Sequence, residues 1–270
     1  MTELQEAILK IAKEVHKICI ENDIPYFMLG GTFIGAIRHK GFIPWDDDLD
    51  IGLTYDNYLR LQKVLKGMNH PWLVTESAML GDDCPHLFTK VYDKNTTFLH
   101  TGSKGPVKGV FVDIFPVVYA GNTKEHARIE MKCAFFWRKI LEQKYCNPYA
   151  DRPLLKYSTK LLSMLFPKSF VINKCKKQYD RLSSTPTKYF SALDGTKKDV
   201  YDKYYFNEDV VLYHFEDTQL YGIKDYDNFL TDVFKNYMQL PPEDKRVGHH
   251  VVDYDLHIPY EQYNKEHGYK

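Results

Sequence analysis

The chain has 270 residues, of which 44% are hydrophobic and 27% are charged, a composition typical of a globular protein with a sizeable core. Its 36 basic residues balance 36 acidic ones, which argues against a general nucleic-acid binder. Five scattered cysteines without a CxxC pair predict neither a zinc site nor a disulfide framework. We expect no signal peptide and no transmembrane segment, and therefore a cytoplasmic protein.

The first element that the sequence predicts is an amphipathic helix over residues 3–21. Apolar residues recur there at helical spacing, and Thr2 and Gln5 form a capping box at its start. A short strand is expected over 24–29 and a second amphipathic helix over 54–65.

A glycine turn follows the first strand. Gly30 and Gly31 let the backbone turn sharply and let a ligand approach it closely, and Thr32 adds a hydroxyl group. We expect a helix to start over 32–37, and backbone N–H groups at a helix start bind anions. The turn is therefore a candidate phosphate site.

An acidic strand is predicted next, because Asp48-Leu49-Asp50-Ile51 alternates polar and apolar residues. Strand side chains point alternately to opposite faces, so Asp48 and Asp50 share one face while Leu49 and Ile51 face the core. Two carboxylates about 7 Å apart repel each other, and a divalent cation removes that repulsion. We interpret the preceding Asp46 and Asp47 as acids that solvate a turn.

Two more strands are predicted over 72–75 and 88–92. Lys90 lies within the second of them, as either a solvated edge lysine or a phosphate partner. A third, strongly apolar strand over 109–118 carries one charge, Asp113, and we expect Pro116 to end it. An unpaired buried carboxylate is costly, so Asp113 either lies in water or binds a positive group.

Beyond residue 125 the sequence is mainly helical. Strands and turns are expected over 201–223, and helices over 123–145, 154–166, 171–182 and 225–238. The basic and aromatic character of 126–220 could suit a membrane surface that carries a lipid-linked acceptor, but we prefer ordinary packing of these helices against the core as its explanation.

A charged segment, QLPPEDKRVGHH, follows the last of these helices. Its two prolines stop the helix, and Lys245, Arg246 and His249 come directly after this rigid turn. These residues are either a solvated charge run or part of a binding pocket. Arg38 and His39, in the basic triplet after the glycine turn, are either plain loop charges or phosphate partners.

Several of these segments together resemble one family. The run GGTFIGAIRHKGFIPWDDDLDIGL, the run VDIFP and the run NYMQLPPEDKR are similar to the signatures of the LicD family, the bacterial phosphocholine transferases related to fukutin and fukutin-related protein. Within the wider polymerase β-like nucleotidyltransferase superfamily, the interval from Gly31 to Asp48 is unusually long. The RHKGFIPW segment that fills it is itself LicD-like.

The resemblance implies an α+β fold in a single catalytic domain over 1–270. A nucleotidyltransferase-like mixed sheet with flanking helices would occupy 1–125. A mainly helical half that binds donor and acceptor would occupy 126–270.

The resemblance also implies an enzyme, a phosphotransferase that moves phosphocholine from CDP-choline to a hydroxyl of a glycan precursor and releases CMP. The precursor would belong to teichoic acid, lipopolysaccharide or capsule, on the inner face of the membrane. Magnesium, or alternatively manganese, would be bound by the three catalytic carboxylates Asp48, Asp50 and Asp113, with Asp113 as the preferred proton acceptor. The substrate-binding residues would be Gly30, Gly31, Thr32, Arg38, His39, Lys90, Lys245, Arg246 and His249.

Two alternatives stay open at this point, and a third falls behind them. The cargo could be phosphoribitol, phosphoglycerol or phosphoethanolamine, or the chain could be a true nucleotidyltransferase that releases pyrophosphate. A catalytically inactive scaffolding member would need a broken acid triad, and all three acids are present.

A choline group would need an aromatic wall, for which Trp45, Tyr92 and Tyr237 are candidates.

Overall fold

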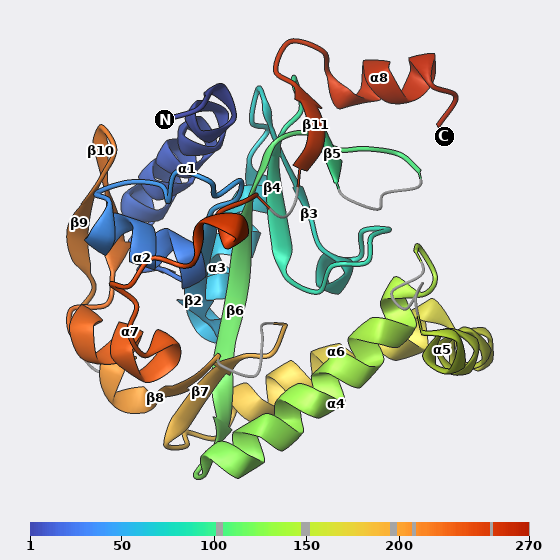
Figure 1. The fold of residues 1–270 in the computed structure, drawn as a ribbon. Helices are drawn as coiled ribbons and strands as arrows, with labels where there is room; N and C mark the ends of the chain where they lie inside the picture. The colour runs from blue at the N-terminus through green and yellow to red at the C-terminus, as the bar shows by residue number, and fades with distance from the viewer. Residues whose placement is uncertain (101–104, 147–151, 195–198, 207–208, 249–250, 270) are drawn as a thin grey trace.

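A mixed sheet lies at the centre of the computed structural model, which describes residues 1–100, 105–146, 152–194, 199–206, 209–248 and 251–269 (Figure 1). Within these residues the sheet has seven strands in the order β1-β2-β6-β4-β3, with β7 paired to β6 and β8 paired to β7. Strands β2 and β6 are parallel, whereas the other pairs are antiparallel. The strands are β1 (Phe27–Met28), β2 (Asp50–Thr54), β3 (Leu73–Glu76), β4 (Thr89–Asp93), β6 (Phe111–Gly121), β7 (Tyr189–Ala192) and β8 (Val200–Asp202).

Helices and two small antiparallel pairs surround this sheet. One pair joins β9 (Val211–Phe215) to β10 (Thr218–Gly222), and the other joins β5 (Thr97–His100) to β11 (Val251–Asp255). The helices are α1 (Glu3–Glu21), α2 (Gly30–Arg38), α3 (Tyr55–Gly67), α4 (Lys124–Glu142), α5 (Pro153–Leu165), α6 (Lys168–Ser183), α7 (Tyr226–Phe234) and α8 (Tyr260–Glu266), with short 3₁₀ turns at Ala78–Leu80, Lys203–Phe206 and Glu243–Lys245. The predicted α+β fold is thus confirmed.

The two faces of the sheet carry different side chains. Val15 of α1 lines one narrow space together with Ile51 of β2 and Val112 of β6. These residues are almost completely buried, and burying each such side chain stabilises the fold by about 1.5–3 kcal/mol. Because strand side chains alternate, Asp50 and Asp113 point to the face opposite α1.

The N-terminus of α1 holds the loop that precedes the acidic strand. The predicted capping box is confirmed, since the N–H of Gln5 donates to Thr2 Oγ1 at 3.2 Å and the N–H of Thr2 donates to Gln5 Oε1 at 3.0 Å. The amide nitrogen of Gln5 also donates to the carbonyl oxygens of Ile43 and Asp46, at 3.2 and 2.9 Å. One buried side chain therefore fixes both the helix and the loop.

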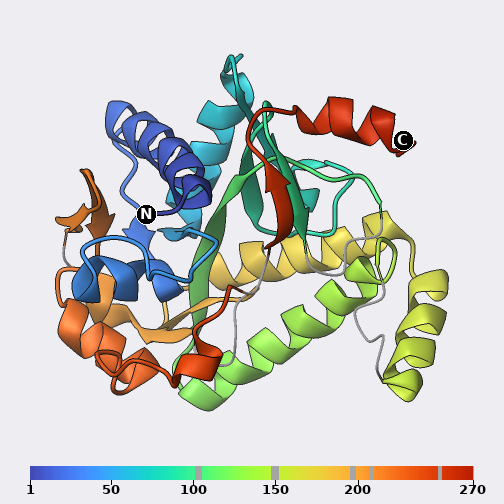
Figure 2. The ribbon, with the colours of Figure 1, turned by 45° about the horizontal axis from the view of Figure 1, so that its top comes forward.

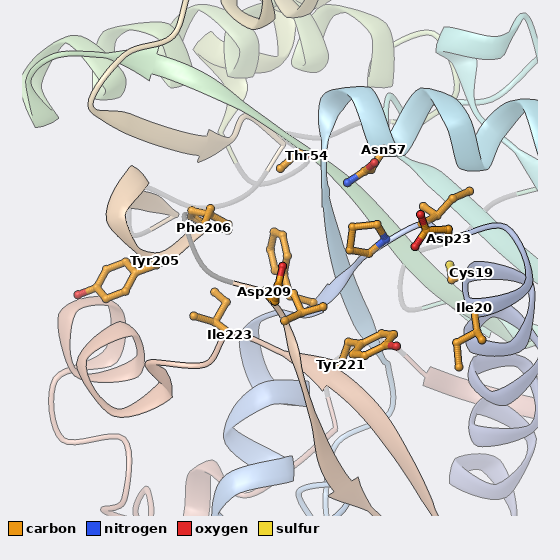
Figure 3. A pocket seen from close by; sticks show the side chains of 14 residues that line it. Cys19, Ile20, Asp23, Thr54, Asn57, Tyr205, Phe206, Asp209, Tyr221 and Ile223 are labelled. Carbon is orange, nitrogen blue, oxygen red and sulfur yellow. The ribbon is translucent and has the colours of Figure 1, made fainter.

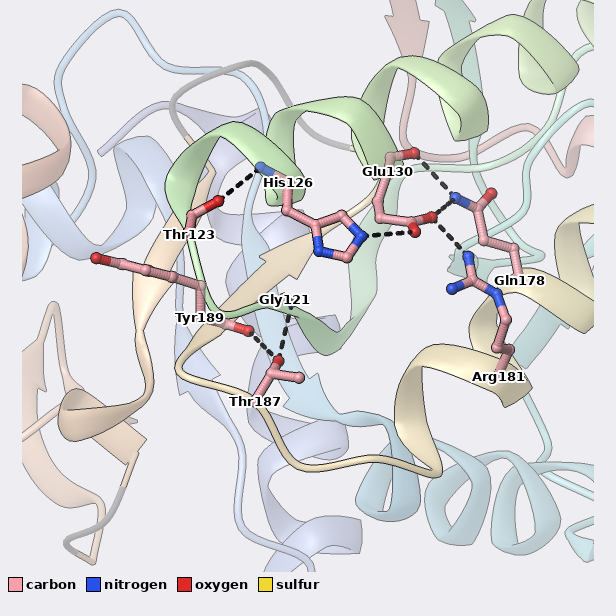
Figure 4. Close-up of polar contacts among 8 residues, drawn as sticks. All are labelled: Gly121, Thr123, His126, Glu130, Gln178, Arg181, Thr187 and Tyr189. Carbon is pink, nitrogen blue, oxygen red and sulfur yellow. Dashed lines mark hydrogen bonds and ion pairs between the residues drawn. The ribbon is translucent and has the colours of Figure 1, made fainter.

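Helices α4 and α6 lie side by side along the far end of the sheet and are joined through Glu130 (Figures 1 and 4). Its Oε2 accepts hydrogen bonds from the side chains of Gln178 and Arg181, each at 2.7 Å, and its Oε1 lies 3.4 Å from His126 Nε2. Although burial acts to raise the pKa of Glu130, these hydrogen bonds and charges outweigh it and lower that pKa.

The prediction that Pro116 ends its strand is wrong, because β6 continues through it. The N–H of Asp113 donates to the carbonyl of Leu49, the residue directly before β2, so the nitrogen of Pro116 points to the other edge of β6. On that edge, β4 pairs only as far as Ile114, and β7 begins at Val117. The missing N–H of the proline falls in the gap between these two strands, where no ladder hydrogen bond is lost.

Three other expectations need correction. Asp48 lies before β2 instead of within it. The last predicted helix ends at Phe234, because Lys235 has a φ of +64°, and not at the prolines. Beyond residue 125, strands β8 to β10 lie where strands were expected over 201–223, but β7 and β11 were not predicted, and β7 and β8 extend the central sheet.

Candidate active site

Three charged residues form a row across adjacent strands. In the parallel pair β2–β6, Asp50 lies opposite Asp113, and in the antiparallel pair β6–β4, Asp113 lies opposite Lys90. Directly opposite residues point to the same face, with Cβ atoms about 4.5–5.5 Å apart. The row continues to Glu76 of β3, which pairs with Lys90 and whose carboxylate lies 2.7 Å from Lys108.

Lys90 holds both oxygens of Asp113. Its Nζ lies 2.7 Å from Oδ1 and 2.8 Å from Oδ2, and 3.5 Å from the centroid of the Phe111 ring. The side chain of Lys90 is 4% exposed, so it is not a solvated edge lysine. Asp113 thus binds a positive group, as its apolar strand requires, and that group belongs to the protein.

Three neighbouring carboxylates, those of Asp48, Asp113 and Asp46, act on the pKa of Asp50. Burial raises the pKa of Asp50 well above its ordinary value of 3.8, and the charges of Asp48 and Asp113 raise it further. Lys90 acts in the opposite direction, and Asp46 adds a smaller upward contribution. The two acids of the predicted strand are therefore close enough to interact, although Asp48 precedes that strand.

These carboxylates have the chemistry of a magnesium site, because a hard divalent cation takes oxygen ligands and would relieve their repulsion. In the part of the chain that the structure describes, however, no three acidic, histidine or cysteine side chains stand at the spacing of a metal site. Lys90 already occupies the two oxygens of Asp113. A metal held by Asp48, Asp50 and Asp113 stays a prediction, and it would share the carboxylate of Asp113 with Lys90.

The glycine turn packs directly against the acids. Gly30 begins α2 with a φ of +53°, and a Cβ atom there would lie 3.4 Å from Asp50 Oδ2. A Cβ atom on Gly31 would lie 2.6 Å from Asp46 Oδ2, a distance at which something must move. The hydroxyl oxygen of Thr32 accepts the N–H of Asp50 at 2.8 Å. The segment GGT is therefore shaped to let two carboxylates approach the positive end of a helix.

The basic triplet contacts the C-terminal charged segment. Arg38 donates to the carbonyl oxygen of Tyr237 at 2.7 Å, which anchors the chain after α7. The ring centroids of His39 and Trp45 are 6.5 Å apart, and the guanidinium carbon of Arg246 lies 5.7 Å from the centroid of Trp45. Residues that are about 200 positions apart in the sequence thus form one group, although Arg38 serves here as a structural anchor.

Asp47 is a site residue that sequence reasoning missed. It is 5% exposed, and its Oδ2 accepts the N–H of Val251 at 2.9 Å. A Cβ atom on Gly248 would lie 2.8 Å from the same oxygen. The interpretation that Asp47 only solvates a turn is therefore wrong, because it fixes the C-terminal segment beside the acids. No local sequence pattern predicts a contact between residues 204 positions apart.

The remaining predicted residues are placed as follows. Lys245 is exposed on the 3₁₀ turn Glu243–Lys245, and His249 lies outside the described residues. Tyr92 and Tyr237 are only 2% and 7% exposed, so neither presents a ring face to a ligand. Trp45 is half-buried beside Arg246 and remains a candidate for the aromatic wall of a choline site.

A cavity of about 620 Å³ lies elsewhere, at the other end of β2 (Figure 3). Its lining includes Thr54, the last residue of β2, together with Cys19, Asp23, Tyr205 and Tyr221. It contains none of the predicted site residues. The candidate site is thus a charged surface at the beginning of β2, outside this cavity.

Comparisons with known proteins agree with the residues that gather here. A family model described as the LicD/FKTN/FKRP nucleotidyltransferase domain matches residues 23–161, which include the glycine turn, the acids and Lys90. The lipopolysaccharide cholinephosphotransferase LicD of Haemophilus influenzae is 32% identical over 267 residues, covering 94% of this chain and 97% of that protein.

Two shorter similarities involve uncharacterised proteins. RP689 of Rickettsia prowazekii is 41% identical over 59 residues, which is 22% of each chain. RT0683 of Rickettsia typhi is 39% identical over 59 residues, which is 22% of this chain and 19% of that protein.

Among the described residues, no helix is long and apolar enough to cross a bilayer. With a family model over half of its length and a relative that matches it almost from end to end, the chain belongs to the LicD family.

Proposed function

We propose that this enzyme, a phosphotransferase, moves phosphocholine from CDP-choline to a hydroxyl group of a cell-surface glycan precursor. The observation that carries the proposal is the near full-length similarity to a protein named as a lipopolysaccharide cholinephosphotransferase. The row of Asp50, Asp113 and Lys90 supports it, because phosphoryl transfer needs positive charge near the phosphates and a base near the attacking hydroxyl.

The reaction that we propose is a displacement at the phosphorus atom next to choline. The acceptor oxygen forms a bond to this phosphorus while the bond to the bridging oxygen breaks, and CMP leaves with that oxygen. The hydroxyl proton passes to a carboxylate. We assign this proton to Asp50 in preference to Asp113, because Lys90 holds both oxygens of Asp113.

Asp48, Asp50 and Asp113 are the residues that we propose to hold Mg²⁺ or Mn²⁺, which would supply positive charge to the phosphates and lower the pKa of the acceptor hydroxyl. The chain's own residues then have two tasks. Asp46 and Asp50 are kept beside the N-terminus of α2 by the glycine turn, and Asp47 keeps the C-terminal segment against the same loop.

The test is transfer from CDP-choline that is labelled in the phosphate next to choline. With Mg²⁺ and an acceptor glycan, we expect the label on the acceptor and unlabelled CMP in solution. Label in the released nucleotide would mean attack at the other phosphorus atom and would refute phosphocholine transfer. CDP-ribitol, CDP-glycerol and CDP-ethanolamine, assayed in parallel for CMP release, distinguish the cargo.

A further inference from the structure

Helix α5 turns its apolar stripe away from the protein. Leu154, Tyr157, Leu161, Met164 and Leu165 are 86%, 67%, 59%, 76% and 64% exposed. Their spacing of three or four residues places them on one side of the helix. A surface helix of a globular protein normally directs such a stripe to the core, so the orientation of α5 is the reverse of the usual one.

Leu162 packs α5 against the core, and polar contacts attach the helix beside it. Thr159 is 9% exposed, and its hydroxyl group donates to Gln143 Oε1 at 3.1 Å. The carbonyl oxygen of Ser163 accepts a hydrogen bond from Lys144. These two residues lie on the side of the helix opposite the apolar stripe, so the polar side of α5 faces the protein and the stripe faces outward.

Aromatic residues of α4 and α6 extend the exposed apolar area. Phe136 and Phe170 are 45% and 39% exposed and both pack on Trp137, with ring centroids 5.1 and 6.0 Å from it. Phe166, directly after α5, stacks on Phe170 at 5.2 Å. Figures 1 and 2 both show α5 at the edge of the molecule, beyond the adjoining ends of α4 and α6.

The charge of this region differs from that of the whole chain. Residues 152–179 contain seven lysine and arginine residues and no aspartate or glutamate, although the chain as a whole is neutral. Lys156 and Lys160 lie on α5 itself, and Lys174 lies 5.5 Å from the ring of Phe170. Lys168 is neutralised in part by an ion pair with Asp83. The exposed apolar stripe is therefore flanked by positive charge.

We propose that the solvent-facing stripe of α5, with Phe136 and Phe170, docks on the surface of a bilayer that contains anionic lipids. A helix with exposed large apolar residues and flanking lysines lies in the interface, where the acyl chains take the apolar side chains and the anionic headgroups attract the lysines. A second copy of the chain fits less well, because it would bring two positively charged surfaces together. This inference does not depend on the donor or the cargo of the proposed reaction.

The experiment measures binding of the full chain to vesicles without any nucleotide donor. One set of vesicles contains phosphatidylcholine alone, and the other also contains phosphatidylglycerol. We expect co-sedimentation with the anionic vesicles, which weakens as salt is added because screening shortens the range of the attraction. The triple variant Leu154→Ser/Leu161→Ser/Met164→Ser should lose at least about tenfold in affinity, since three exposed apolar side chains no longer enter the acyl region.

Charge and position are tested separately. The variant Lys160→Glu/Lys174→Glu should lose about fivefold or more for each lysine on anionic vesicles. The matched control is Leu212→Ser, which changes a 44% exposed leucine on β9, at the opposite side of the molecule (Figure 1), and should bind like the unchanged chain. Thermal unfolding checks that each variant is folded.

Three results would overturn the proposal. The first is an absence of vesicle binding by the unchanged chain, and the second is binding that the triple variant and Leu212→Ser retain equally. The third is a dimer in sedimentation analysis that the triple variant converts to a monomer, which would identify a second copy as the occupant. Because no donor is present, none of these results bears on phosphocholine transfer.

Discussion

The ammonium group of Lys90 lies within 2.8 Å of both carboxylate oxygens of Asp113, at a place where the two side chains are 4% and 11% exposed. A buried ion pair of this kind contributes little net stability as a pair, but the loss of one partner leaves an uncompensated buried charge. Removal of Lys90 should therefore change the stability of the protein, whether or not Lys90 touches substrate.

The first prediction concerns that dependence. Lys90→Met should lower the free energy of unfolding by about 3–5 kcal/mol, since buried Asp113 loses the ammonium group that both of its oxygens bind. Denaturant unfolding without divalent cations measures the effect. Lys90→Met/Asp113→Asn should regain most of the loss, and Mg²⁺ should stabilise Lys90→Met more than the unchanged chain. Equal stability of Lys90→Met and the unchanged chain would contradict this account.

The second prediction separates chemistry from folding at Asp50. Asp50→Asn keeps the shape of the side chain but removes a charge that three neighbouring carboxylates repel. Transfer should fall about a hundredfold or more, while thermal stability without metal is kept or increased. Asp56→Asn, an exposed acid on α3, is the control and should retain transfer. Substantial turnover by Asp50→Asn would show that this carboxylate is dispensable.

The third prediction tests the glycine turn. Gly31→Ala places a methyl group where Asp46 Oδ2 would be 2.6 Å away, so the flexible carboxylate must move while the backbone stays. We expect a folded protein with strongly reduced transfer. Gly67→Ala, at the end of α3 with no atom within 4 Å of the new methyl group, should be about 0.4–1 kcal/mol more stable and fully active. Normal transfer by Gly31→Ala would mean that the position of Asp46 does not matter.

The fourth prediction concerns pH and the contact between α4 and α6. The pKa of Glu130 is lower in the folded chain than its ordinary value of 4.5, so the folded state binds fewer protons there than the unfolded state. Its stabilising effect is complete above pH 4.5 and is lost as the pH falls through the lower, folded value. Glu130→Gln should thus be less stable than the unchanged chain at neutral pH. That difference should shrink in unfolding curves below pH 4.5, and a constant difference would exclude an ionic origin.

The sequence predicts most of the fold because its local signals are strong. The helix over 3–21 has both the apolar period and the capping box, and the structure gives the same bounds. The error at Pro116 has a different origin. Whether a proline ends a strand depends on which edge its nitrogen faces and on where the neighbouring strands stop, and both are properties of the sheet as a whole.

The residues of the candidate site could be predicted from the sequence only in part. Asp50 and Asp113 could be singled out because a carboxylate in an apolar strand needs an explanation. The partner of Asp113 could not be read from the sequence, since Lys90 is brought to it only by the antiparallel register of β4 and β6. Asp47 was misjudged for the same reason, and the contact of Arg38 was not foreseen, because each binds a backbone group about 200 residues away.

The contact between Asp47 and Val251 also bears on how the protein reaches its final form. These residues are 204 positions apart, so a loop of most of the chain must close before the contact exists. Closing so long a loop costs entropy before any contact repays it, and contacts of this range form slowly. A nascent chain that has already formed β1, β2 and β6 still lacks the C-terminal segment around Val251 that packs beside its acids. Completion of the site is therefore tied to the last steps of folding, and a partly synthesised chain carries the carboxylates without their finished surroundings.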